Sequence, residues 1–128
     1  MPLVRISVRA GQSQEHRLPL GDCVYRAMAE TMNVPAGDKF QIISEHDSAG
    51  LIYDPEYLGI HRTDGVVFIQ VTLNLGRTLE VKRAFYARVA ALLKAELNLR
   101  PEDVLINLVE VPKENWSFGN GEAQYAPQ

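Results

Sequence analysis

The chain has 128 residues, of which 46% are hydrophobic and 23% charged, a length and composition typical of one globular domain. The formal net charge of −3 and the lack of any Lys/Arg-rich run argue against a nucleic-acid partner. The single cysteine, Cys23, excludes an intrachain disulfide, and neither a signal-peptide pattern nor a run of about 18 apolar residues is present, so we expect a cytoplasmic domain with no membrane partner.

The chain begins MPLVRISV, where a proline comes directly before an alternating segment that predicts a strand over 3–10. Val4, Ile6 and Val8 share one face of this strand, and the other face is polar. Proline has no backbone N–H to donate, so Pro2 is acceptable as the first residue of a strand without any function. The alternative is that the nitrogen of Pro2 takes part in catalysis. The strand alone does not distinguish a structural from a catalytic Pro2.

A helix is expected after the first strand, but Pro19 and Gly21 fall within it. Because proline breaks helices in their interior, we predict a kink or a late start near Pro19 and a helix that continues to about Met32. The loop NVPAGD (33–38) and a strand at about 39–45 follow this helix.

A polar, turn-rich linker over 47–65 leads to a second strand–helix–strand series, and one short strand is expected inside the linker at Leu51–Tyr53. The strand over 66–74 has a wholly apolar face. The next helix is expected to begin after Thr78, which can cap its first turn, and apolar residues recur along it at helical spacing. Then come the loop NLRPED (98–103), a strand over 104–111 and a C-terminal segment, 112–128.

The second half of the chain repeats the first with a constant offset of 65 positions, which divides the single domain 1–128 into halves of about 1–46 and 66–111. A doubled β-α-β unit predicts an α+β fold, in which a four-stranded sheet carries both helices on one face because the crossovers are right-handed. The other face then holds a mixed set of side chains that needs cover, which favours self-association. Matched pairs are Gly11 and Gly76, Asn33 and Asn98, Asp38 and Asp103, and Glu45 and Glu110.

Four features occur in order along the chain: Pro2 before the first strand, the doubled unit, a strand–Gly-Arg-Thr–helix junction at 76–78, and the ending ENWSFGNG at 114–121. Together with VPAGDKFQ at 34–41, they resemble the tautomerase superfamily, most closely its malonate semialdehyde decarboxylase-like members. The resemblance covers nearly the whole chain and implies a homotrimer that acts on a small oxo-acid bearing a carboxylate. No cofactor is expected, and the three histidines show no metal-ligand spacing.

The resemblance also implies the site residues. Pro2, exposed as the N-terminus when Met1 is removed, matches the catalytic proline at the base of the pocket. Arg77 matches an arginine that binds the substrate carboxylate. Asp38 matches an aspartate that activates or orients water in the decarboxylase and hydratase members, and Trp116 matches an aromatic wall of the pocket. Methionine before a small residue such as proline is usually removed, so we expect the mature chain to begin at Pro2.

The chain departs from the decarboxylase pattern at two points. Phe40, expected to contact the substrate, stands where the family has a tyrosine, and residues 74–77 (NLGR) carry one arginine where the decarboxylase pattern has two. These differences favour proton transfer between enol and keto forms, with Pro2 as base and Arg77 holding the carboxylate. The alternatives are a decarboxylase or hydratase that uses Asp38 with water, and a member without catalysis that serves assembly or partner binding.

Each candidate residue also has a purely structural explanation. Pro2 can be an ordinary strand start, and Arg77 can be a solvated residue at the start of a helix. Asp38 can mark the passage from loop to strand, as its repeat partner Asp103 suggests. Trp116 can seal the core or a subunit edge.

Overall fold

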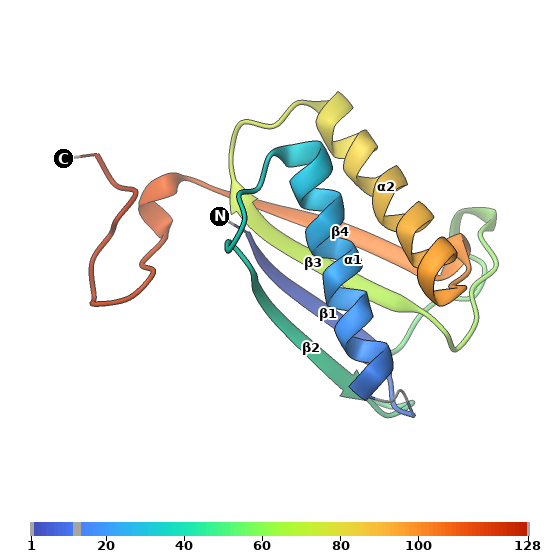
Figure 1. Ribbon diagram of the computed structural model, residues 1–128. Coiled ribbons are helices and arrows are strands. Elements are labelled where there is room, and N and C mark those ends of the chain that lie inside the picture. Colours follow the sequence, from blue (N-terminus) through green and yellow to red (C-terminus); the bar gives the residue numbers. More distant parts are fainter. Residues whose placement is uncertain (1, 12–13, 128) are drawn as a thin grey trace.

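The computed structural model describes residues 2–11 and 14–127, and in this part of the chain two helices cover one face of a four-stranded sheet (Figure 1). Within the same residues, no helix is long and apolar enough to cross a membrane. The strands are β1 (Leu3–Arg9), β2 (Phe40–His46), β3 (Val67–Asn74) and β4 (Val104–Val111), and the helices are α1 (Gln14–Met32) and α2 (Leu79–Leu97). Short 3-10 helices lie at Tyr57–Gly59, Pro101–Asp103 and Lys113–Asn115.

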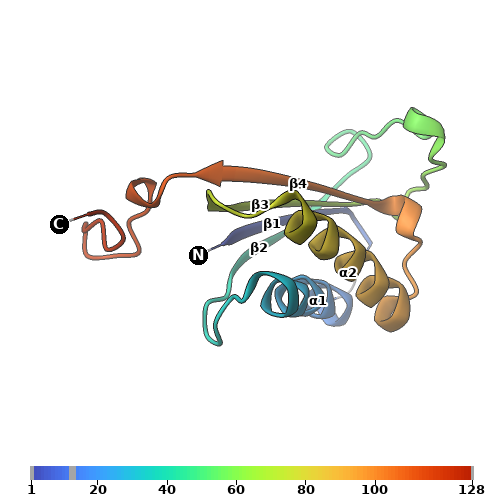
Figure 2. The ribbon, with the colours of Figure 1, turned by 90° about the horizontal axis from the view of Figure 1, so that it is seen from above.

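The strands run in the order β2-β1-β3-β4 across the sheet. β1 is parallel to β2 and β3 is parallel to β4, while the central pair, β1 and β3, is antiparallel. Figure 2 shows both helices on the same side of the sheet, which confirms the predicted α+β arrangement. As a result, β1 and β2 begin at the same end of the sheet at which β3 and β4 finish.

The register of the sheet confirms that the β-α-β unit is duplicated. Leu3 faces Phe40 in the first parallel pair, and Phe68 faces Leu105 in the second, each 65 positions after its counterpart. Both helices are followed by an asparagine in the left-handed conformation, with φ of 56° and 53°. Asparagine tolerates this conformation better than most residues, so the two helices end by the same device. The boundaries of the two halves stay a prediction from the sequence.

The core lies between the inward faces of β1 and β3 and the two helices. Alternate residues of both strands are buried, and most of their neighbours on the other face are exposed or half-buried, as expected for strands with one covered face. Each fully buried aliphatic or aromatic side chain stabilises the fold by about 1.5–3 kcal/mol. The largest completely buried side chains include Phe85, Ile6, Leu20, Met28, Ile69, Leu73 and Leu93.

Helix α1 begins at Gln14, so the predicted late start near Pro19 is wrong, although the predicted end at Met32 is correct. Pro19 lies inside the helix, where it removes one backbone hydrogen bond. Leu20 and Cys23, which follow it, are completely buried in the core. Because most helical stability in proteins comes from packing, this burial outweighs the local cost of the proline.

Gly21, the second helix breaker, lies where α1 approaches β2. Gln41 Nε2 donates to the Gly21 carbonyl at 2.8 Å, and a Cβ on Gly21 would lie 2.1 Å from Gln41 Oε1. Glycine therefore permits a contact between helix and strand that a side chain would block.

The linker, which the structure describes throughout, does not form the short strand expected at Leu51–Tyr53, so that prediction is wrong. Asp47 Oδ1 accepts hydrogen bonds from the backbone N–H groups of Ala49 and Gly50, at 3.1 and 2.8 Å, and these bonds form a turn instead. Leu51 is only 3% exposed. Leu51 is therefore apolar because it anchors the loop in the protein interior, and it does not belong to a strand.

Candidate active site

Most of the predicted site residues lie at the end of the sheet where β1 and β2 begin and β3 and β4 end. Pro2 directly precedes β1, Phe40 is the first residue of β2, and Asn74 is the last residue of β3. The register in which Leu3 faces Phe40 places Pro2 one step before this pair, next to the loop that contains Asp38. In Figure 1 the N-terminus lies at the same end of the sheet as the C-terminal segment.

A cavity of about 210 Å³ opens at this edge. Pro2 is buried in its wall, and Phe40 remains half exposed. The rings of Trp116 and Phe118 stack with centroids 5.4 Å apart and 10° between their planes, and Tyr125 packs edge-on against Phe118 at 5.0 Å. The structure thus brings three predicted residues, Pro2, Phe40 and Trp116, to one largely apolar cavity. Its lining is Pro2, Leu3, Phe40, Trp116, Ser117 and Phe118.

Arg77 is not part of this lining, and Asn74 connects it to the cavity wall. Arg77 Nη1 donates to the Asn74 carbonyl at 3.0 Å, and Trp116 Nε1 donates to Asn74 Oδ1 at 2.7 Å. Asn74 thus links two predicted site residues into one cluster. Asn74 could not be predicted as a site residue, because its contact with Trp116 spans 42 positions and leaves no pattern in the sequence.

The junction that carries Arg77 is shaped by its two neighbours. Gly76 has φ of 121°, a conformation that residues with side chains rarely adopt. Thr78 Oγ1 accepts from the backbone N–H of Val81 at 3.2 Å, which confirms the predicted cap of α2. Arg77 is half-buried at the N-terminal end of α2, where the helix dipole favours an anion. Because a guanidinium has five N–H donors, one bond to a carbonyl leaves others for a ligand.

Asp38 is a buried carboxyl group, only 5% exposed, two residues before Phe40. Its backbone N–H donates to the Pro35 carbonyl at 3.2 Å, which closes the turn that delivers the chain to β2. Burial raises the pKa of the Asp38 carboxyl above its ordinary value, and the positive charge at the start of the chain partly opposes this rise. Asp38 is therefore a buried carboxyl at the end of the sheet where β1 and β2 begin.

Asp103, the repeat partner of Asp38, has a different environment. It is 3% exposed, and it accepts hydrogen bonds from both the backbone N–H and the hydroxyl of Thr63, each at 2.7 Å. Thr63 belongs to the linker, so Asp103 anchors the linker to the start of β4. The sequence allowed both aspartates a purely structural role between loop and strand, and the contacts of Asp103 fit that role.

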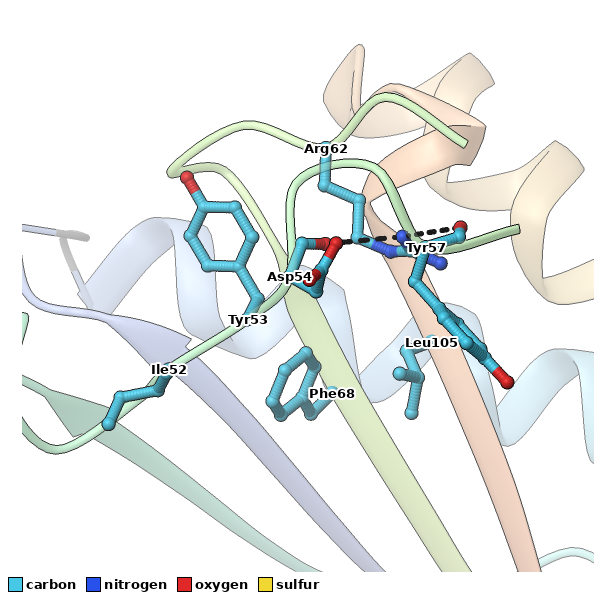
Figure 3. Close-up of a pocket in the computed structure, with 7 residues that line it drawn as sticks. All are labelled: Ile52, Tyr53, Asp54, Tyr57, Arg62, Phe68 and Leu105. Atoms are coloured by element: carbon cyan, nitrogen blue, oxygen red, sulfur yellow. Dashed lines mark hydrogen bonds between the residues drawn. The ribbon is translucent and has the colours of Figure 1, made fainter. Parts of the chain in front are cut away.

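A second hollow, of about 200 Å³, lies between the linker and the starts of β3 and β4 (Figure 3). Its arginine, Arg62, points into the loop: Arg62 Nη1 donates to the carbonyls of Asp54, Tyr57 and Ile60 at 3.3, 3.0 and 3.2 Å. Arg62 therefore braces the linker. Among the residues that the structure describes, no group of three or more His, Cys, Asp or Glu could hold a metal ion.

Two family models, both described as tautomerase enzyme, match residues 38–119 and 2–60. The chain belongs to the tautomerase family. This tautomerase-family chain is 42% identical to probable tautomerase YusQ of Bacillus subtilis (strain 168), over 97% of its own length and 98% of that protein. It is 34% identical to probable tautomerase YrdN of the same organism, over 98% of its length and 96% of that protein.

Solved structures give the same family. The chain matches malonate semialdehyde decarboxylase FG41, inhibited by 3-bromopropiolate, with a TM-score of 0.90 and 37% identity, over 96% of this chain and 93% of that one. A second malonate semialdehyde decarboxylase matches with a TM-score of 0.90 and 30% identity, over 96% and 95%. A fused 4-OT symmetric trimer, 23% identical with a TM-score of 0.78, shares the fold over 98% and 99%. These matches confirm the predicted resemblance and the fold of the tautomerase.

Proposed function

We propose that this tautomerase interconverts the enol and keto forms of a small 2-oxo acid, with the Pro2 amine as base and Arg77 holding the carboxylate. The observation that carries this proposal is the arrangement at one edge of the sheet. Pro2 lies in the wall of an apolar cavity, and the hydrogen bonds of Asn74 join the cavity wall at Trp116 to Arg77.

The proposed chemistry needs the nitrogen of Pro2 as a free secondary amine. Met1, whose removal is expected, lies outside the described residues. An α-amine has an ordinary pKa of about 7.7–8.0, and an apolar wall favours its neutral, basic form. Neutral Pro2 accepts the proton of the enol hydroxyl, and the O–H electron pair becomes part of the new C=O bond. The electron pair of the C=C bond then takes a proton at carbon, and the protonated Pro2 supplies it.

Arg77 would hold the substrate by its carboxylate. The guanidinium can form two parallel hydrogen bonds with a carboxylate, and the N-terminal end of α2 adds a favourable dipole. The carboxylate end would then lie toward Arg77 and the reacting carbon toward Pro2. A 2-oxo acid satisfies both contacts, because its carboxylate is bonded directly to the carbon that bears the enol oxygen.

Decarboxylation or hydration of a three-carbon oxo-acid is the second candidate. The TM-scores of 0.90 with two malonate semialdehyde decarboxylases favour it, and Asp38, buried at the same end of the sheet, is a candidate to orient water. Two features place it second: Arg77 is the single arginine of its junction, and Phe40 has no hydroxyl. The junction therefore has one cation fewer to bind the substrate or to stabilise the enolate charge that forms when carbon dioxide leaves.

Incubation of the processed protein with a panel of enols and oxo-acids tests both candidates. Ketonisation is followed by absorbance, and release of carbon dioxide is followed in parallel. We expect ketonisation to be the faster reaction, and Asp38→Asn to reduce it less than it reduces any water-dependent reaction. Release of carbon dioxide from malonate semialdehyde faster than ketonisation of every enol would reverse the order. No turnover of any compound would favour a member that serves assembly or partner binding.

We also propose that the chain forms a homotrimer through the open face of its sheet. This face carries apolar side chains that remain well exposed in the single chain, at Phe40 (51%), Ile42 (42%) and Leu105 (43%). Exposed apolar surface of this kind favours association, and one structural neighbour is a trimer of fused 4-OT. Sedimentation equilibrium at micromolar concentration measures the assembly, and a monomer of 14.3 kDa would refute the proposal.

A further inference from the structure

An ion pair ties the start of α2 to the end of β4. Lys82 Nζ and Glu110 Oε1 are 2.5 Å apart, and their side chains are only 23% and 28% exposed. The backbone N–H of Lys82 donates to the Thr78 carbonyl at 3.1 Å, so Lys82 lies in the first turn of the helix. Glu110 faces Leu73 in the register of β3 and β4. The ion pair therefore joins α2, just after the junction that carries Arg77, to the neighbouring strand β4.

A backbone hydrogen bond also joins this junction to β4. The backbone N–H of Leu75 donates to the Val111 carbonyl at 3.0 Å, one residue beyond Glu110. The hydrogen bond from Lys82 lowers the pKa of the Glu110 carboxyl, and the Gly76 N–H and the Arg77 charge lower it further. Glu110 is therefore an ionised group that interacts with the junction as well as with Lys82.

The repeat contains a second copy of this pair. Arg17 Nε and Glu45 Oε1 are 3.4 Å apart, and these residues lie 65 positions before Lys82 and Glu110. The first half of the chain, however, has glutamine where the second half has Arg77. An ion pair between helix and strand is thus common to both halves, but only the pair in the second half brackets an arginine of the proposed site.

We propose that Glu110, paired with Lys82, is a positioning residue that holds Arg77 for the carboxylate of the substrate. This inference rests on the proposed function of Arg77. Two effects of removing the Glu110 charge have opposite signs. Loss of a negative charge near Arg77 would by itself strengthen the attraction of an anion, whereas a displaced guanidinium would weaken its binding. The sign of the change in KM therefore separates positioning from simple electrostatics.

The test compares Glu110→Gln with its repeat counterpart Glu45→Gln. Steady-state kinetics are measured on the enol of a 2-oxo acid and on its methyl ester, which lacks the carboxylate charge. We expect Glu110→Gln to raise KM for the acid about tenfold with kcat nearly unchanged, because ground-state binding is lost. The ester should be unaffected, and Glu45→Gln should change neither substrate.

Two further variants keep the test decisive if Glu110→Gln fails to fold. Glu110→Asp retains the negative charge but shortens the side chain by one methylene, so a positioning role predicts a raised KM for the acid, whereas charge alone predicts no change. Lys82→Arg should retain most of the acid affinity, because Arg17 forms the equivalent pair with Glu45. An unchanged or lowered KM for the acid in Glu110→Gln, or an equal change for the ester, would overturn the inference.

Arg77→Ala in the same assay separates this inference from the proposed function. One outcome is that Arg77→Ala raises KM for the acid alone while Glu110→Gln gives the same kinetics as Glu45→Gln. In that case only the positioning role of Glu110 is wrong. If Arg77→Ala affects acid and ester equally, carboxylate binding by Arg77 is wrong and the positioning role falls with it.

Discussion

Asp38 and Asp103 occupy the same position in the two halves of the chain, yet they lie in different surroundings at opposite ends of the sheet. Both are almost completely buried. Asp103 accepts two hydrogen bonds from Thr63 and thereby fixes the linker. Asp38 comes just before β2, and burial raises the pKa of its carboxyl. The repeat thus places a buried aspartate at each end of the sheet, but the segments packed against the two aspartates differ. We propose that only the end beside Pro2 takes part in catalysis.

The arginines of the two ends show the same contrast. Arg62 uses one nitrogen to contact three carbonyls of its own loop, so it is committed to structure. Arg77 makes one hydrogen bond to a carbonyl at the end of β3, beside the cluster of Asn74 and Trp116. Arg77 also lies at the N-terminal end of α2, where the helix dipole favours an anion, so it is the arginine better suited to a carboxylate.

Replacing these two arginines should separate the ends most strongly. Arg77→Ala is expected to lower kcat/KM for an acid substrate on the order of 100-fold, because a partly buried charge pair is lost. Arg77→Lys should also lose activity, since a point charge cannot reproduce the bidentate contact. Steady-state kinetics on the enol of a 2-oxo acid provide the measurement.

Arg62→Ala is the matched control for Arg77→Ala. It should lower the midpoint of urea unfolding and leave kcat/KM of the folded protein within about twofold of the wild type. Equal effects of the two arginine variants on acid turnover would erase the proposed difference between the ends.

Asp103→Ala should weaken the structural end of the sheet. It removes the two hydrogen bonds from the Thr63 N–H and hydroxyl, and a typical hydrogen bond contributes about 0.5–1.5 kcal/mol to stability. Urea unfolding monitored by circular dichroism measures the loss. Thr63→Val, which removes only the hydroxyl, should show a smaller loss, and stability equal to the wild type in both variants would contradict the anchoring role.

Asp38→Asn should have the smallest effect on stability, and its dependence on pH is informative. Because burial raises the pKa of Asp38 in the folded protein, its ionisation costs stability as the pH rises from the unfolded pKa, about 3.9, through the folded pKa. Asparagine does not ionise, so the variant should gain stability relative to the wild type between acidic and neutral pH. A difference in unfolding free energy that is constant from pH 3 to pH 7 would show that burial does not raise this pKa.

The fold could be predicted largely from the sequence, because the structure contains both the alternation of apolar and polar residues along the strands and the repeat offset of 65 residues. The start of α1 could not, since the packing of Leu20 and Cys23 overrides the local effect of Pro19. Leu51 was misinterpreted for a related reason: a buried loop anchor and a strand residue are equally apolar.

The candidate site was less accessible to sequence reasoning. Asn74 contacts Trp116 across 42 positions, and no spacing rule reveals such a contact. The sequence also makes Asp38 and Asp103 look equivalent, because the difference between them depends on Thr63, which lies 40 positions before Asp103 in the linker. In the sequence, only the resemblance to the tautomerase superfamily distinguishes Asp38 from Asp103.

We propose that the end of the sheet beside Pro2 is the catalytic one and that the nitrogen of Pro2 is its base. The most direct test measures intact mass and turnover on the same samples, one produced normally and one with removal of Met1 blocked. We expect a mature chain lacking one methionine that turns over the enol of a 2-oxo acid, and no turnover when Met1 is retained, because the nitrogen of Pro2 is then an amide without a basic lone pair. Full turnover from protein of the same assembly state that is verified to retain Met1 would contradict it.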